Sequence, residues 1–378
     1  MAILRKKYTF HGGAEGFSSS FIGNLARAGH GIHIFAIRWE SDPAHANIHF
    51  HRVPAIRAIS FLRDLTFALS SLYLLKKQRE RFDIIQSHDK TLFQDIYRAG
   101  DGCHIEWLRQ RWQRTGAAGK ASIALNPWHW LILALERSIF KGRRFRKVIA
   151  ISEMVKGDIM RNYGIPPSDI EVIYNGVDLA KFTPASRDRF RREIRDRHGI
   201  AEDEFVVLFV GSGFERKGVK YLIEAVESVP GPVTVMIVGK GSEKTLRPLI
   251  RRQKVIYCGP RKDVEKYYAA SDIFVFPTMY EPFGNVHLEA LASGLPVITT
   301  AQSGAAEIIE EGVQGFVVPQ PEDVAAIAGK IEELMASRDK LLSMAARARL
   351  LAEEFTFERH MGKIRELYDE VIAEKDSE

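Results

Sequence analysis

Residues 271–302 read SDIFVFPTMYEPFGNVHLEALASGLPVITTAQ, and their pattern decides the fold. The apolar run at 272–276 is typical of a buried strand. A helical pattern follows at 285–293, Gly294 ends it, and Pro296 opens the next strand, LPVITT. Strand, loop, helix and strand in this order form the unit of a parallel α/β sheet. The sequence therefore predicts an α/β fold.

The loop between that strand and that helix carries groups that a ligand would meet. Ligands of parallel sheets bind at the carboxyl ends of strands, where helices begin. Glu281 lies in this loop, and Glu289 follows eight residues later on the first turns of the helix. The backbone N–H groups of Gly284, Asn285 and Val286 would face the same place. Such N–H groups favour an anion, so we predict an anion site here.

The bulk properties of the chain indicate two globular domains in a reducing compartment. A length of 378 residues is long for a single core. Cys103 and Cys258 are the only cysteines in the sequence, which supports neither a disulfide framework nor a zinc site and fits the cytoplasm. Residues 1–10 lack the apolar core of a signal peptide, and the sequence contains no apolar run of about 18 residues that could span a membrane.

The first domain begins with a strand at residues 2–10 and the turn HGGAEGF. Gly12 and Gly13 in this turn would let the backbone approach a ligand closely, although most Gly-Gly pairs mark only a turn. The turn differs from G-x-G-x-x-G, so a nicotinamide cofactor is not indicated.

Two later stretches of the first domain also carry candidate residues. His88 and Asp89 end the strand DIIQSHD, a position suited to function. The alternative is that Asp89 caps a helix formed by TLFQDIY. Asp101 follows in RAGDGC, between two glycines, where an aspartate is usually a turn residue.

The second domain restarts the α/β pattern with the strand FVVLFV. Its exit loop carries Gly211, Gly213, Arg216 and Lys217. Two cations beside flexible glycines at the carboxyl end of a strand would meet a diphosphate. The alternative is solvation of a helix start, but acids rather than bases are expected there.

These stretches resemble the retaining glycosyltransferases of the GT-B fold, in particular glycosyltransferase family 4. The resemblance covers nearly the whole chain and is most specific at 211–218 and at 281–289, where EPFG and ASGLPVI flank the Glu-x7-Glu spacing. It implies two Rossmann-like domains that face a cleft, with a C-terminal helix that crosses back to the first domain. We expect an acceptor-side domain over 1–174, a nucleotide-sugar-binding domain over 175–358 and the crossing helix over 359–378.

The resemblance also implies roles for single residues. Glu289 would bind the ribose hydroxyls of the donor, Glu281 would lie by the donor hexose, and Arg216 and Lys217 would neutralise the leaving diphosphate. Glu307 would support the donor pocket. The loop that follows the strand KVIYCG would border the nucleobase, and the first glycine loop would border the donor phosphates and the acceptor. The predicted substrate-binding residues are Gly12, Gly13, His88, Gly211, Gly259, Arg261, Phe283, Gly284, Asn285, Val286 and Glu289.

The resemblance further implies a donor and an acceptor. The family's lipopolysaccharide core glucosyltransferases have an Ala-Asp-x-Cys stretch similar to the one around Asp101, which makes Asp101 the candidate catalytic base or acceptor-binding group. We expect UDP-glucose as the donor, and a lipopolysaccharide core or other glycolipid acceptor at the cytoplasmic face of the inner membrane. The sequence contains no Asp-x-Asp motif, so we expect no metal cofactor. A sugar-nucleotide epimerase and a non-enzymatic nucleotide-sugar-binding or nucleic-acid-binding protein are the alternatives.

The positive charge of the chain is concentrated in residues 106–147. This basic segment holds ten Lys and Arg against two Glu, a net charge of +8, so the rest of the chain carries −2 of the overall +6. It also contains four of the five tryptophans, Trp107, Trp112, Trp128 and Trp130. Tryptophan beside cations suits the headgroup region of an anionic membrane, which we predict as a partner. A packed domain face, with Leu131, Leu133 and Leu135 in the core, and a single-stranded nucleic-acid surface are the alternatives.

Overall fold

The computed structural model describes residues 1–8, 21–39 and 46–378, which divide into two compact units. Unit 1 comprises Met1–Tyr174 and Met361–Glu378, and unit 2 comprises Asn175–His360. Unit 2 is therefore one continuous stretch of chain, whereas unit 1 is assembled from two.

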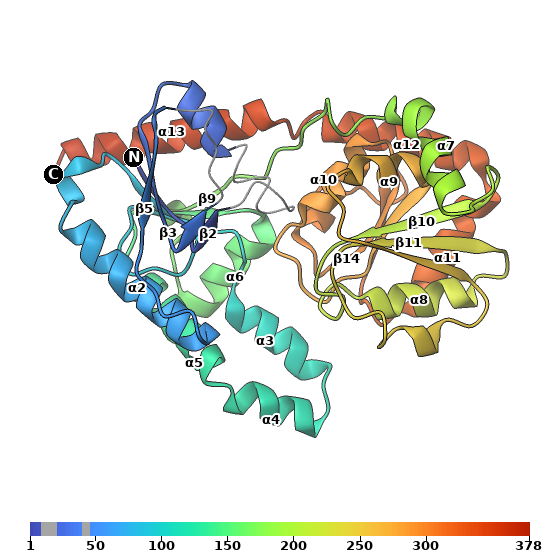
Figure 1. The fold of residues 1–378 in the computed structure, drawn as a ribbon, viewed down its shortest axis with the longest axis horizontal. Coiled ribbons are helices and arrows are strands. Elements are labelled where there is room, and N and C mark those ends of the chain that lie inside the picture. The colour runs from blue at the N-terminus through green and yellow to red at the C-terminus, as the bar shows by residue number, and fades with distance from the viewer. Residues whose placement is uncertain (9–20, 40–45) are drawn as a thin grey trace. The chain divides into compact units, whose positions relative to one another are not determined.

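Unit 1 is built on a seven-stranded sheet with the order β5-β3-β1-β6-β7-β8-β9, in which every pair of neighbours is parallel (Figure 1). The strands are β1 (Ala2–Leu4), β3 (Ile32–Ala36), β5 (Ile48–Arg52), β6 (Ile85–Ser87), β7 (Ile96–Ala99), β8 (Lys147–Ala150) and β9 (Ile170–Val172). A separate short pair joins β2 (Lys7–Tyr8) to β4 (Arg38–Trp39).

Helices cover this sheet and also extend away from it. Residues 21–27 are helical, and the further helices are α2 (Ser60–Lys76), η1 (Arg79–Arg81), α3 (His104–Gln113), α4 (Ala117–Leu125), α5 (Pro127–Phe140), α6 (Glu153–Tyr163) and η2 (Pro167–Asp169). Helices α3 and α4 extend from the body of unit 1 (Figure 1). Ser152 caps α6, because its side chain accepts a hydrogen bond from the N–H of Val155.

Unit 2 is built on a six-stranded parallel sheet with the order β12-β11-β10-β13-β14-β15. The strands are β10 (Phe205–Val210), β11 (Val233–Val238), β12 (Lys254–Gly259), β13 (Ile273–Phe276), β14 (Val297–Thr300) and β15 (Gly315–Val318). Strands β11 and β13 are buried at every position, as expected for a parallel sheet covered on both faces. The two sheets confirm the predicted α/β architecture of two Rossmann-like units.

The helices of unit 2 follow its strands in alternation. They are α7 (Ser186–Arg197), α8 (Val219–Ser228), η3 (Arg247–Leu249), α9 (Val264–Ala270), α10 (Asn285–Ala292), η4 (Gly304–Ile308), α11 (Val324–Ala336) and α12 (Arg338–Ala352). The break between α11 and α12 is made by Ser337, whose side chain accepts from the N–H of Lys340 and so caps α12.

Helix α13 (Phe357–Asp376) brings the chain back into unit 1, as predicted. The Tyr368 hydroxyl donates to Gln86 Oε1 at 2.8 Å, and Lys147 pairs with Glu370 at 2.6 Å. Because Tyr368 and Gln86 are both buried, this bond fixes the helix to the middle of β6.

The alternative prediction of a helix at TLFQDIY is wrong. Residues 96–99 form strand β7, which is buried at all four positions between β6 and β8. The Asp89 side chain caps no helix and instead accepts from the N–H of Lys6 at 2.7 Å. Pairing with two neighbouring strands outweighs the local helical pattern of so short a segment.

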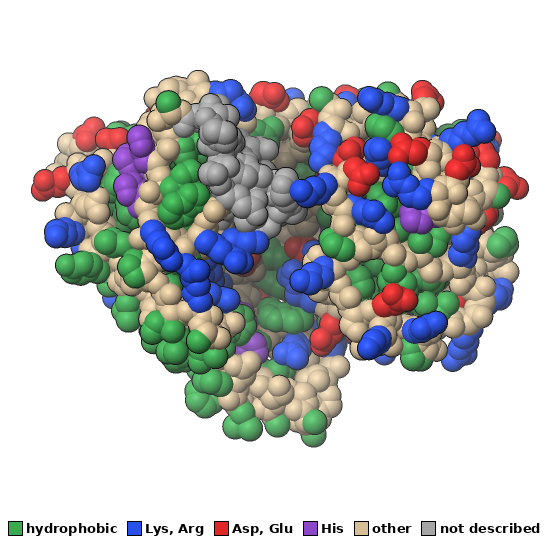
Figure 2. Space-filling view, viewed as in Figure 1, with side chains coloured by type: hydrophobic (Ala, Val, Ile, Leu, Met, Phe, Trp, Pro, Cys, Tyr) green, Lys and Arg blue, Asp and Glu red, His purple; other side chains and the backbone are tan. Residues whose placement is uncertain are grey.

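Large exposed hydrophobic side chains of unit 1 gather on one group of helices. Among the described residues of this unit they are Ile56, Ile59, Leu69, Tyr73, Trp112, Leu125 and Trp130. Figure 2 shows hydrophobic side chains gathered over α2 and α5, which pack against each other. In the described part of the chain, no helix is both long and apolar enough to cross a membrane.

Candidate active site

The candidate site of unit 2 lies where the strand order of its sheet reverses. The chain runs outward from β10 through β11 to β12, and then returns to pair β13 with the other side of β10. Ligands of open α/β sheets bind at this switch point, at the carboxyl ends of the strands. The loops that follow β10 and β13 therefore meet there, and these loops carry the predicted catalytic residues Arg216, Lys217 and Glu281.

Direct backbone contacts join the two loops. The N–H of Met279 donates to Arg216 O at 2.9 Å, and the guanidinium of Arg216 donates to Tyr280 O at 3.2 Å. A Cβ at Gly218 would lie 1.7 Å from Pro277 O, so no other residue fits at that position. The position of the cations relative to the second loop is therefore fixed by the backbone.

One carboxylate binds both predicted cations. Glu281 Oε2 lies 3.4 Å from Arg216 Nη2 and 3.4 Å from Lys217 Nζ. Burial would raise the pKa of Glu281, but Lys217 and Arg216 overcome it and the pKa lies below its ordinary value. The cluster therefore holds two cations and one ionised carboxylate, a net charge of +1 that suits an anion.

The side chain of Lys217 is confined on two sides. A Cβ at Gly211 would lie 2.8 Å from Lys217 Cδ, so the glycine leaves room for the lysine stem. The ammonium lies 5.2 Å from the centre of the Phe276 ring, within range of a cation–π contact. Gly211 is therefore needed because a larger residue would collide with the Lys217 side chain. The sequence alone does not distinguish this reason from close approach of the backbone to a phosphate.

Helix α10 begins beside this cluster with its first turn held by a buried histidine. Gly284 precedes the helix with φ of +81°, and as the N-cap residue it has no side chain that could cap the N–H groups that follow. His287 is fully buried and its Nδ1 lies 2.9 Å from Gly284 O, while its Nε2 lies 2.9 Å from Thr299 Oγ1. A carbonyl can only accept, so Nδ1 carries the proton. Burial lowers the pKa of His287 to about 4, so the ring is neutral at pH 7.

Glu289 lies one turn further along α10 and is half-buried. Its Oε2 accepts from the Tyr268 hydroxyl at 3.0 Å. Burial raises the pKa of Glu289, and Tyr268, Lys181 and Lys217 oppose that effect. Neither Tyr268 nor His287 is predicted from the sequence, because a tyrosine or histidine on an apolar helix face usually indicates a core residue.

The remaining predicted residues of unit 2 are placed differently. Phe283 has a fully buried side chain, so it supports the loop from beneath and only its backbone can face a ligand. Gly259 ends the edge strand β12 and Arg261 follows it, and β11 separates this strand from β10. The Arg261 Nε donates to Cys258 O at 2.7 Å. Glu307 is exposed on η4.

Unit 1 has its own switch point, between β1 and β6. There Lys6 pairs with Asp89 at 3.0 Å and with Asp64 at 3.2 Å. His88 Nε2 lies 2.6 Å from Gln86 Nε2, so the amide donates and the ring accepts. The same Gln86 accepts from Tyr368 of α13, which links the orientation of His88 to that helix.

Asp101 is exposed in the turn after β7. Three residues further along the chain, the N–H of His104 donates to Glu136 at 2.7 Å, and this fully buried carboxylate also pairs with Lys90 at 3.3 Å. These contacts fix the turn that presents Asp101. The predicted residues Gly12 and Gly13 lie outside the described residues.

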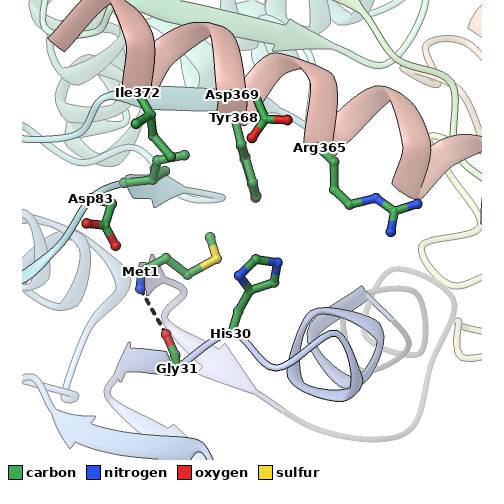
Figure 3. Close-up of a pocket in the computed structure, with 9 residues that line it drawn as sticks. Met1, His30, Gly31, Asp83, Arg365, Tyr368, Asp369 and Ile372 are labelled. Atoms are coloured by element: carbon green, nitrogen blue, oxygen red, sulfur yellow. Dashed lines mark hydrogen bonds between the residues drawn. The ribbon is translucent and has the colours of Figure 1, made fainter. Parts of the chain in front are cut away.

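A cavity of about 180 Å³ occurs elsewhere in unit 1, lined in part by Met1, His30, Asp83, Arg365 and Tyr368 (Figure 3). The Met1 ammonium donates to Gly31 O at 2.8 Å at its rim (Figure 3). Met1, His30 and Asp83 precede β1, β3 and β6, and Arg365 and Tyr368 lie on α13, so the cavity is at the amino ends of the strands, opposite to the switch point. We therefore do not assign it to the active site. In the residues that the structure describes, no three His, Cys, Asp or Glu converge to hold a metal ion.

Comparison with known proteins agrees with this architecture. The chain matches the family described as Glycosyltransferase Family 4 over residues 11–181, and the family described as Glycosyl transferases group 1 over residues 190–351. A crystal structure of WaaG, a glycosyltransferase involved in lipopolysaccharide biosynthesis, aligns with a TM-score of 0.82 at 24% identity, over 97% of this chain and 99% of that chain. The chain is a glycosyltransferase of the GT-B fold.

Relatives of this glycosyltransferase occur in distant organisms. The lipopolysaccharide glucosyltransferase WaaG of Escherichia coli is 26% identical over 333 residues, 85% of each chain. An uncharacterized glycosyltransferase of Methanocaldococcus jannaschii is 27% identical over 329 residues, 82% of each chain. A crystal structure of Anabaena HepE in complex with UDP-glucose has a TM-score of 0.70 at 20% identity, covering 98% of this chain and 100% of that chain.

We expect Lys217→Ala to lower the turnover of this glycosyltransferase by roughly 100- to 1,000-fold, because the lysine would stabilise charge that grows in the transition state. Donor binding should weaken less than turnover. Lys220→Ala is the matched control: this lysine is exposed on the adjacent helix and pairs only weakly with Glu224, at 3.7 Å. Steady-state kinetics measure the turnover of both variants. A Lys217→Ala variant with wild-type turnover would show that Lys217 does not stabilise the leaving diphosphate.

We also expect unit 2 to lose stability as the pH falls from about 6.5 to about 4. An exposed histidine protonates near 6.5, whereas His287 in the folded unit has a pKa of about 4. Between these values the unfolded state binds more protons, so the free energy of unfolding decreases on acidification. His287→Asn removes this contribution and should flatten the dependence on pH.

The measurement must report unit 2 alone. All five tryptophans lie in unit 1, so their fluorescence does not follow the unfolding of unit 2. Hydrogen-exchange protection of the β13 and α10 amides, measured between pH 7 and pH 4.5, gives the required free energies. Equal slopes for the wild type and His287→Asn would contradict the assignment of a neutral, buried imidazole.

Proposed function

We propose that this glycosyltransferase transfers a hexose from a nucleoside diphosphate sugar to a glycolipid acceptor, with retention of the anomeric configuration. The donor is UDP-glucose, and the acceptor is a lipopolysaccharide core or a related glycolipid at the cytoplasmic face of the inner membrane. The reaction needs no metal ion.

The cluster of Arg216, Lys217 and Glu281 carries this proposal. It holds an excess of positive charge at the switch point of unit 2, beside the uncapped first turn of α10. Cations and aligned N–H groups are the two protein devices that bind a diphosphate without a metal. Their convergence supports a nucleotide-sugar donor bound in unit 2.

The chemistry of such a site is mainly electrostatic. Departure of the nucleoside diphosphate leaves negative charge on its terminal phosphate oxygens, where Lys217 and Arg216 would stabilise it. Glu281, held ionised by these cations, would face the donor hexose, and Glu289 would accept hydrogen bonds from the ribose hydroxyls. Fixing both ends of the donor lowers the entropic cost of reaching the transition state.

The relatives support the choice of donor and acceptor. HepE has been crystallised with UDP-glucose, and WaaG is named as a lipopolysaccharide glucosyltransferase. In unit 1, the exposed Asp101 and the oriented His88 are the candidates to bind or deprotonate the acceptor hydroxyl. Both follow neighbouring strands, β7 and β6, at their carboxyl ends.

The experiment is a panel of nucleotide sugars, each assayed for hydrolysis and for transfer to a lipopolysaccharide core acceptor, with and without EDTA. We expect UDP-glucose to be used in preference and the activity to survive chelation. The product should have the anomeric configuration of the donor. Loss of activity on chelation, restored by Mg²⁺ or Mn²⁺, would contradict metal independence. Conversion of the donor alone into an epimer would favour the epimerase instead.

An anionic membrane remains the proposed partner of the basic segment (residues 106–147). The ion pairs of this segment limit which of its residues would contact the lipid. Arg143 pairs with Asp169 at 2.6 Å, Arg146 with Glu378 at 2.6 Å, and Lys147 with Glu370 at 2.6 Å. Trp128 is half-buried and its indole N–H donates to Asp64 at 2.8 Å. These groups are engaged within unit 1, so they do not form the membrane contact.

A different part of the same segment remains for the lipid. One face of α5 is exposed at residues 130, 134 and 137, and it continues at the C-cap residue Lys141, which places Trp130 in line with Arg137 and Lys141. Trp112 and Leu125 are exposed on the neighbouring α3 and α4. Indoles that enter the boundary and cations that meet anionic headgroups would share this face.

We expect Arg137→Gln/Lys141→Gln to weaken binding to anionic vesicles by about tenfold or more at low salt, since each cation near an anionic surface contributes about 1 kcal/mol. Trp130→Ser should remove the part of the binding that survives high salt, because indole burial is not screened. Vesicle co-sedimentation measures both effects.

The matched control is Arg189→Gln/Arg192→Gln, which removes two exposed cations from α7 of unit 2. It should bind anionic vesicles as the wild type does. If the wild type binds neutral and anionic vesicles equally, or binds neither, the segment is a packed face of unit 1 and not a membrane contact.

A further inference from the structure

Tyr268 is a buried tyrosine with its hydroxyl directed at the helix of the candidate site. It lies on α9 and is 0% exposed. The hydroxyl oxygen lies 3.0 Å from Glu289 Oε2 and 3.2 Å from Val286 O, both on α10. A phenol has one proton to donate, and an ionised carboxylate is the stronger acceptor of the two. The proton therefore goes to Glu289.

This bond restricts how Glu289 can present its carboxylate. An unrestrained glutamate has three rotatable side-chain bonds, and ordering it costs free energy when a ligand binds. With Oε2 fixed by Tyr268, the orientation of Oε1 and of the remaining lone pair on Oε2 is fixed as well. Two vicinal hydroxyls of a ribose could then bind to a carboxylate that is already in place.

We propose that Tyr268 is a positioning residue for Glu289, which it holds ionised and oriented for the ribose of the nucleotide. The inference rests on the proposed function, because it takes Glu289 as the ribose-binding carboxylate. It adds a residue of α9 that need not touch the donor.

The packing around the tyrosine ring supports this role. The ring of Phe182 meets the Tyr268 ring edge to face with centroids 5.6 Å apart, and Phe274 of β13 lies 6.0 Å away. Phe182 belongs to the segment just after residue 175, where the chain enters unit 2. Arg349 of α12 donates both to Phe182 O and to Ala292 O at the end of α10, each at 3.0 Å. Phe182 therefore packs against the Tyr268 ring, and Arg349 links the backbone of Phe182 to the end of α10.

The charges that face Glu289 come from every element around it. Lys181 from the entering segment and Lys217 from the β10–α8 loop lower its pKa, Glu265 of α9 raises it, and Arg349 of α12 lies at the far end of α10. Burial raises the pKa of Glu289 overall, and the bond from Tyr268 opposes this. Removing the hydroxyl should therefore raise the pKa of Glu289 further.

The test is calorimetric titration of the full protein with UDP across the range from pH 8 to pH 5. Ribose hydroxyls bind the ionised carboxylate, so UDP affinity should fall on acidification as Glu289 is protonated. Tyr268→Phe should weaken UDP binding roughly three- to tenfold at neutral pH, and the fall in affinity should occur at a higher pH than in the wild type. Glu289→Gln should bind weakly at every pH and lose the part of the fall that comes from the carboxylate. The part that comes from the terminal phosphate of UDP, whose second pKa is about 6, should remain in every variant.

Tyr163→Phe is the matched control, because it removes a hydroxyl that donates to Glu136 at 2.8 Å, the same type of bond within unit 1. It should leave both the UDP affinity and its pH profile unchanged. If Tyr268→Phe binds UDP like the wild type while Glu289→Gln is weakened, the inference about Tyr268 is wrong and the proposed function stands. If Tyr268→Phe weakens UDP binding equally at every pH, without a shift in the pH profile, Tyr268 has only a packing role. Wild-type affinity of Glu289→Gln would overturn the ribose role itself.

Discussion

The ion pairs of Glu281 with Arg216 and Lys217 are the interaction on which the site depends. A carboxylate this buried would be costly to ionise alone, and two cations placed side by side would repel each other. Glu281 reduces the repulsion between the two cations, and the cations stabilise its ionised form. The cluster retains one net positive charge. The backbone bonds between the β10 and β13 loops fix the distance, so the cluster exists before any ligand arrives. Such preorganisation is what makes electrostatic stabilisation effective in catalysis.

The two switch points differ in their charge balance. In unit 2 a single carboxylate meets two cations. In unit 1 Asp64 and Asp89 meet Lys6, and Arg63 binds Asp64 at 3.0 Å, which leaves that cluster balanced. A positive cluster suits a diphosphate, and a balanced one suits neutral hydroxyl groups. Among the described residues, the two switch points thus differ in the net charge of a few side chains, and this difference would suit the proposed binding of the donor by unit 2 and of the acceptor by unit 1.

The sequence predicts the sheets and the loop residues of this protein better than it predicts their support. Strand runs such as VTVMIV and the loop from Glu281 to Gly284 are local patterns, and they fold as such. Strand β7 was open to a helical interpretation, because only its neighbours β6 and β8 make it a strand. Tyr268 and His287 act through contacts with distant residues, and composition does not reveal such contacts. The basic segment likewise read as one surface, although Arg143, Arg146 and Lys147 are paired within unit 1.

The division of unit 1 into two stretches of chain has a consequence for synthesis. Unit 2 is continuous in sequence and can complete its sheet while the ribosome is still adding later residues. Unit 1 has all seven strands by residue 172, yet Gln86 and Lys147 must wait for Tyr368 and Glu370. Until then the side-chain amide of Gln86, in the middle of β6, lacks the hydrogen bond from Tyr368. Unit 1 is therefore translated first but completes its contacts last. The Gln86 side chain that orients His88 gains its bond from Tyr368 only when α13 has been made.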